Sequence, residues 1–172
     1  MQLQFVIWSL IPCAALTLKC SRFPNDSYDK LYFEDCAAGA EVEFFNATAK
    51  NSKGNEEYPI YLKESGTLNI LGKNVGGKAH TAVYYNGKLY ARRIVFGCGW
   101  TKLPTFGLLG GLKAQKDPQP LDIPIKVNEY KTIIFLMNPR KAIQMVANYH
   151  DNESDDHLGC IFLQMRVTKK RE

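Results

Sequence analysis

Short runs rich in Val, Ile, Thr, Tyr and Phe recur along most of this chain between turn-forming residues, and no stretch sustains the period of an amphipathic helix. This pattern is typical of an antiparallel β-sandwich, in which each strand buries every second side chain. We therefore predict an all-β, immunoglobulin-like β-sandwich, with strands at residues 42–49, 67–75, 121–127, 130–137, 141–149 and 160–168.

The run at residues 42–49 does not alternate strictly. Phe44 and Phe45 fall on opposite faces of a regular strand, while Asn46 must face solvent if it carries a glycan. An extra residue in one strand of a pair re-aims the side chains that follow it. The sequence therefore predicts a β-bulge in this run.

The pair Asn86-Gly87 gives the clearest local turn signal. Asn and Gly are preferred at the two positive-φ positions of a type I′ turn. The flanking residues then predict a β-hairpin that continues to Phe96, in which Tyr84 faces Leu89 across the turn.

The segment 97–112 is apolar and rich in glycine, and its pattern is not that of a strand. As an exposed loop it would form an apolar patch of the kind that contacts lipid, membrane or protein. The alternative is that it folds back and caps the core. On the first interpretation, the basic side chains of Lys102 and Lys113 could meet anionic headgroups, and the membrane or entrance loop consists of Trp100, Leu103, Phe106, Leu108 and Leu109.

The N-terminus has the features of a cleavable secretory signal. Residues 1–15 carry no charge, contain an apolar run and end in small residues. The apolar run is too short to span a bilayer, which needs about 20 residues. We expect residues 16–172 to form one domain in an oxidising compartment, either secreted or in the endolysosomal lumen.

The mature chain keeps four cysteines, which in such a compartment favour disulfides over metal ligands. Of the three possible connectivities we favour Cys36 with Cys160 and Cys20 with Cys98. Three N-glycosylation sequons agree with this route and predict surface positions for Asn25, Asn46 and Asn152.

Charge and motifs argue against several function classes. The net charge of +5 is too small and too dispersed to indicate nucleic acid, whereas an anionic membrane surface is a suitable partner for a basic secreted protein. His80, His150 and His157 lack the spacing of a zinc site, and there is no nucleophile elbow or phosphate-binding loop. We expect a non-catalytic protein without metal or cofactor.

Several short motifs, taken in order, resemble the ML lipid-recognition domain family. They are residues 32–36 (YFEDC), residues 58–60 (YPI), residues 66–72 (GTLNILG) and residues 157–161 (HLGCI). The resemblance extends from about Tyr32 to Val167 and also supports the pairing of Cys36 with Cys160. The chain departs from the ganglioside-activator members of the family, which have further cysteines in the middle third, where this chain has only Cys98.

The resemblance implies a sandwich opened into a cup whose apolar cavity holds lipid tails, with no catalytic residues. Burying an acyl chain gains about 0.8 kcal/mol for each methylene. Inward-facing apolar residues of a sandwich whose sheets part are therefore a suitable lining for a lipid tail. The candidate cavity residues are Leu68, Ile70, Ile94, Phe96, Ile133, Phe135, Ile143, Met145 and Phe162.

The implied function is the binding of a glycosphingolipid or phospholipid and its transfer from a membrane to a lysosomal glycosidase or another acceptor. Two alternatives stay open. One is an ML protein that binds a sterol or a lipid of the lipid A type. The other is an extracellular interaction module with a packed core and no lipid.

Overall fold

The computed structural model describes residues 20–37, 39–74, 83–94, 98–103, 108–112, 119–125, 135, 137–151 and 154–170. The predicted signal sequence at residues 1–15 lies outside these ranges. So do several individual residues for which a role is predicted, namely His80, Phe96, Phe106, Lys113, Ile133 and Asn152.

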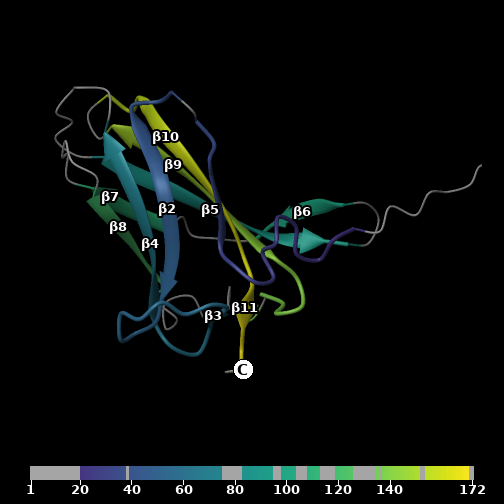
Figure 1. Ribbon diagram of the computed structural model, residues 1–172. Coiled ribbons are helices and arrows are strands. Elements are labelled where there is room, and N and C mark those ends of the chain that lie inside the picture. Colours follow the sequence, from purple (N-terminus) through teal and green to yellow (C-terminus); the bar gives the residue numbers. More distant parts are fainter. Residues whose placement is uncertain are drawn as a thin grey trace, which may run out of the picture.

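Two antiparallel sheets make up most of the described chain (Figure 1). The larger sheet, sheet A, has the order β1-β10-β9-β5-β6, and β7 also pairs with β5. Its strands are β1 (Tyr32–Asp35), β5 (Val83–Arg93), β6 (Gly99–Lys102), β7 (Leu108–Leu112), β9 (Ile143–Asp151) and β10 (His157–Met165).

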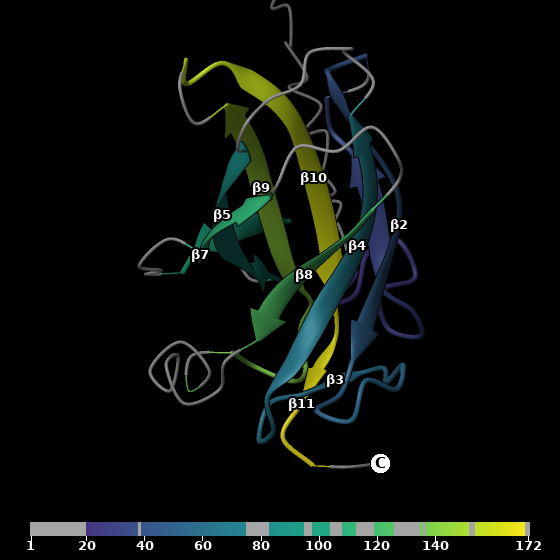
Figure 2. The same cartoon turned by 90° about the vertical axis from the view of Figure 1, so that its left-hand side faces the viewer.

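Sheet B has the order β2-β4-β8 and faces sheet A (Figure 2). Its strands are β2 (Val42–Lys50), β4 (Gly66–Asn74) and β8 (Gln119–Ile125). The short strands β3 (Ile60–Tyr61) and β11 (Val167–Thr168) form a parallel pair near the C-terminus. The predicted all-β sandwich is confirmed.

The core lies between the two sheets because alternate side chains of each strand point inward. In β9, Ile143, Met145, Ala147 and Tyr149 are almost completely buried, whereas the residues between them are less so. Across the gap, the ring of Phe44 in β2 lies 4.8 Å from the ring of Tyr149. This tilted aromatic contact joins the inner faces of the two sheets.

The edge formed by β1 and β2 is closed by polar contacts. The carboxylate of Asp35 accepts hydrogen bonds from the backbone N–H groups of Ala37 (2.9 Å) and Phe44 (3.1 Å), and so links the end of β1 to β2. The N–H of Cys36 donates to the carbonyl of Cys160 at 3.0 Å, and a disulfide joins the same two residues. The predicted pairing of Cys36 with Cys160 is confirmed.

The sequence pattern located most strands of the core correctly. The predicted runs at 42–49, 67–75, 121–127 and 141–149 correspond to β2, β4, β8 and β9. The bulge in β2 is also confirmed, because the register with β4 shifts between Phe44 and Asn46. The run at 160–168 is divided between β10 and β11.

The predicted hairpin at Asn86-Gly87 is wrong. Both residues lie inside β5, a single continuous strand that pairs with β9 on one side and with β7 on the other. Gly87, for example, pairs with Ala147 of β9 and Leu108 of β7. These distant partners satisfy the backbone of an extended strand, so they override the local turn preference.

The segment 97–112 was also predicted wrongly as lacking strand structure. It contains β6 and β7, which both pair with β5 and so extend sheet A. In the predicted strand at 130–137, Phe135 has helical conformation and Met137 belongs to no strand. The remaining residues of that run lie outside the described ranges.

Replacing Asn86 with threonine tests the continuous strand directly. In a type I′ turn, a β-branched residue at positive φ would cost about 1–2 kcal/mol. In a strand, Thr is favoured, so we expect the free energy of unfolding to stay constant or to rise by up to about 0.5 kcal/mol in urea titrations. Asp155→Thr is the matched control, because Asp155 has a φ of 59°, and a loss of about 1 kcal/mol is expected there.

Replacing Cys36 and Cys160 together with serine should destabilise the protein strongly. The bond closes a loop with a sequence separation of 124 residues, and the chain-entropy model gives a loss of about 4–5 kcal/mol for such a loop. Urea unfolding of the oxidised wild type and the double variant measures this loss. A difference below about 1 kcal/mol would contradict it.

Candidate functional site

The interior between the sheets is the candidate lipid site, and four of the predicted cavity residues lie in it. Leu68 and Ile70 of β4 are buried in the core from sheet B, and Ile143 and Met145 of β9 are buried in it from sheet A. By register, Leu121 and Ile123 of β8 pair with Ile70 and Leu68. The structure therefore brings these predicted residues together on facing inner surfaces.

Phe162 and Phe135 do not fit the predicted lining. Phe162 alternates along β10 with Ile161 and Leu163, which are fully buried in the core, so it lies on the outer face of sheet A, where its ring meets Tyr32. Phe135 is 80% exposed, and its ring contacts the amino group of Lys169. Ile94 is half-buried, whereas Phe96 and Ile133 lie outside the described residues.

The predicted entrance loop is part of sheet A. Leu103 is buried in the core, and its N–H donates to the carbonyl of Leu89 at 2.8 Å, so it is not exposed at a membrane surface. Trp100 in β6 is half-buried. Leu108 and Leu109 belong to β7, and Phe106 lies outside the described residues.

The sandwich is closed along one edge. Of the described strands of sheet B, only β2 makes more than marginal backbone contact with sheet A, through β1 and β10. The opposite edge is formed by β7 of sheet A and β8 of sheet B, and it faces the viewer in Figure 2. Of the described strands, β7 and β8 thus lie on the side where the two sheets make at most marginal backbone contact.

An open groove lies at the closed edge, in the part of the chain that the structure describes. Its volume is about 310 Å³, at the lower end of the range for small-molecule sites. The apolar lining comes from Leu31, Ala47, Ala49 and Tyr58, and the charged rim from Asp29, Lys30, Glu56 and Glu57. No sequence pattern indicated this groove, because its lining comes from three separate segments.

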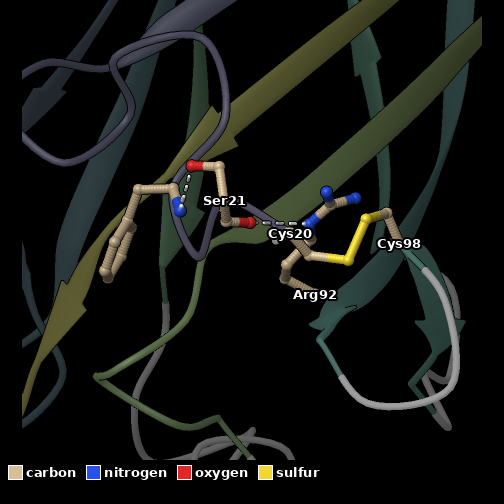
Figure 3. The surroundings of a disulfide bond; sticks show 5 residues. Cys20, Ser21, Arg92 and Cys98 are labelled. Carbon is tan, nitrogen blue, oxygen red and sulfur yellow. Dashed lines mark hydrogen bonds between the residues drawn. A yellow bond between two sulfur atoms is a disulfide. The ribbon is translucent and has the colours of Figure 1, made fainter. Parts of the chain in front are cut away.

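The residues before β1 form a strap, residues 20–31, that crosses the outer face of sheet A. Its start is held by the predicted disulfide between Cys20 and Cys98, which is confirmed, and by a hydrogen bond from Nε of Arg92 to the carbonyl of Ser21 at 3.1 Å (Figure 3). Further along, Nδ2 of Asn25 donates to Oε1 of Gln164 at 3.1 Å.

Tyr58 holds the far end of the strap. Its phenol donates to the carbonyl of Ser27 at 2.5 Å and accepts from the N–H of Arg166 at 2.6 Å. Burial raises the pKa of Tyr58 to about 12. The strap is therefore connected to the junction of β10 and β11 by a neutral phenol that bridges two backbone groups.

Two of the three sequon asparagines are exposed, as an attachment site requires. Asn25 lies in the strap, with a φ of 55°, and Asn46 lies at the bulge of β2. Asn152 is outside the described residues.

Within the described ranges, no group of three His, Cys, Asp or Glu side chains is placed to hold a metal ion. His150 and His157 are cross-strand neighbours in β9 and β10, with ring centroids 5.5 Å apart. Nδ1 of His150 lies 3.6 Å from a carboxylate oxygen of Asp155. No helix of the described chain is long and apolar enough to cross a membrane.

A comparison with protein-family models matches no family, and a comparison with curated proteins finds no relative. The likeness to the ML lipid-recognition family therefore rests on the residues of this chain. The two disulfides are compatible with an extracellular or secreted protein.

Tyr58 should make the stability of the protein depend on alkaline pH. The folded state holds the phenolic proton more tightly than the unfolded state, whose pKa is near 10, so the stabilisation is complete below pH 10 and is lost as the pH rises through about 12. Tyr58→Phe should cost about 1–2 kcal/mol at neutral pH, because it leaves the Ser27 carbonyl and the Arg166 N–H without their partner.

Urea unfolding of both proteins at neutral and at strongly alkaline pH measures this effect. The gap in free energy between wild type and Tyr58→Phe should narrow in alkali. A gap that is the same at both pH values would contradict the role given to the phenol.

Proposed function

We propose that this protein is a non-catalytic lipid-binding and lipid-transfer protein of the secretory or endolysosomal route, with an ML-type sandwich similar to that of the ganglioside activator. It takes a glycosphingolipid or phospholipid from a membrane into the apolar interior between its sheets. It then presents the lipid to an enzyme, such as a lysosomal glycosidase, or to another acceptor.

The observation that carries this proposal is the asymmetry of the sandwich. The sheets meet closely along β1, β10 and β2, whereas the described residues of β7 and β8 form an edge with at most marginal backbone contact between the sheets. Apolar residues of both sheets lie together in the interior, among them Ile70, Leu89 and Met145. An acyl chain that enters between the sheets there would exchange water for an apolar lining.

The second candidate is a lipid-free extracellular interaction module. It is favoured by the contact of Phe44 with Tyr149, which fills the space between the sheets at one end, and by the complete burial of Ile161 and Leu163. A sandwich packed in this way along its whole length would have no room for a lipid tail.

Added lipid should stabilise the delipidated mature protein if the proposal is right. At a free concentration about 100 times the Kd, binding adds about 2.7 kcal/mol. For a chain of this size, that raises the Tm by about 5–10 °C in a thermal scan. The experiment compares the rise in Tm caused by phosphatidylcholine, a ganglioside and cholesterol, each presented in detergent micelles. The size of the rise ranks these lipid classes by how tightly they bind.

Native mass spectrometry of protein from a secretory host provides the complementary result. A lipid bound at one molecule per chain is expected. Protein that carries no lipid after purification and shows no shift in Tm with any of the three would favour the interaction module.

A further inference from the structure

Six cations gather at one corner of sheet A, where four segments meet. The N–H of Ala142, just before β9, donates to the carbonyl of Arg22 in the strap at 2.9 Å, and the N–H of Arg92 in β5 donates to the carbonyl of Ala142 at 3.0 Å. Strand β6 pairs with the same part of β5. The resulting basic corner consists of Arg22, Arg92, Arg93, Lys102, Arg140 and Lys141.

The charges of the basic corner are available to a partner. Arg22, Arg93, Lys102 and Arg140 are exposed, and Arg92 and Lys141 are half-buried. No ion pair joins any of them to a carboxylate of the described residues. The corner thus holds six of the 22 Lys and Arg residues of a chain whose net charge is +5.

Two aromatic side chains lie among these cations. The guanidinium carbon of Arg92 is 5.2 Å from the ring centroid of Trp100, which is its cross-strand partner. Tyr90 pairs with Lys102 in the same ladder, and both aromatic residues are half-buried. Trp and Tyr are enriched at membrane–water interfaces, and clusters of Lys and Arg bind anionic lipid surfaces. Trp100 and Lys102 also belong to the segment for which the sequence predicts membrane contact.

We propose that the basic corner docks this protein on bilayers rich in anionic phospholipid. The inference rests on the proposed function, which requires contact with a membrane, and adds the surface that makes it. Strands β6 and β7 pair with opposite ends of β5, so the corner lies on the same edge of sheet A as β7 but at its other end, away from the closed edge at β1 and β2. Docking there would place the β6 end of this edge against the lipid.

Charge reversal at three exposed positions of the corner tests the surface. The triple variant Arg93→Glu, Lys102→Glu and Arg140→Glu keeps Arg92, whose Nε bonds to the strap. Each cation near an anionic surface changes the partition coefficient of a protein between membrane and water by about fivefold. The variant should therefore bind phosphatidylserine-containing vesicles at least about a hundredfold more weakly than the wild type. Wild-type binding should be weak on pure phosphatidylcholine and should fall as salt is added.

The matched control reverses three exposed lysines elsewhere: Lys30→Glu, Lys53→Glu and Lys63→Glu. It makes the same change in net charge, and we expect its binding to the vesicles to fall by much less. Thermal unfolding of both variants checks that they are folded. Uptake of lipid from detergent micelles should be unchanged in both, because it does not depend on docking.

Three outcomes would overturn the proposal. Equal losses in the two triple variants would indicate only a net-charge effect. Wild-type protein that takes up lipid from micelles but ignores phosphatidylserine vesicles would refute the docking surface and leave the lipid-binding function intact. Retention on heparin without vesicle binding would assign the corner to a sulfated polysaccharide instead.

Discussion

The carboxylate of Asp35 and the adjacent disulfide are the contacts on which the rest of the sandwich depends. The carboxylate accepts hydrogen bonds from the N–H groups of Ala37, just after β1, and Phe44, in β2. The disulfide joins the end of β1 to β10. Together they hold an edge of sheet A against an edge of sheet B. This placement allows Phe44 of β2 to reach across the gap to the ring of Tyr149.

Closure at one edge has a direct consequence for the opposite edge. The aromatic contact and the hydrogen bonds of Asp35 set the separation of the sheets near β2, whereas β8 makes at most marginal backbone contact with the described strands of sheet A. Among the described strands, the two sheets are therefore held together more closely at the edge of β1 and β2 than at the edge of β7 and β8. The proposed entry of a lipid between the sheets uses the second edge.

Arg92 connects the strap to the basic corner. Its backbone N–H belongs to the junction with Ala142, its side chain holds the strap at Ser21, and its guanidinium covers the ring of Trp100. The disulfide between Cys20 and Cys98 ties the strap at the same place. The basic corner is thus built on a part of sheet A that is held by covalent and polar contacts, so its charges are presented in a fixed arrangement.

The sequence by itself determined the features that depend on neighbouring residues. Runs of strand-forming residues located β2, β4 and β9, and the spacing of Phe44, Phe45 and Asn46 indicated the bulge. An even set of cysteines indicated disulfides, and the favoured one of the three connectivities is the one observed. The side chains of Leu68, Ile70, Ile143 and Met145 were assigned to the interior from their inward-facing positions in the predicted strands. For the strands, the bulge and these four side chains, the information lies within a few residues of the position concerned.

Only the tertiary structure decided the features whose cause is a distant partner. Asn86-Gly87 prefers a turn locally, yet β7 and β9 pair with it on both sides, and their many hydrogen bonds outweigh that preference. The same pairing with β5 turns segment 97–112 into strands and buries Leu103. Phe162 is apolar like its neighbours, and only the register of β10 places it on the outer face. Strand register is set by partners far along the chain, which a local pattern does not contain.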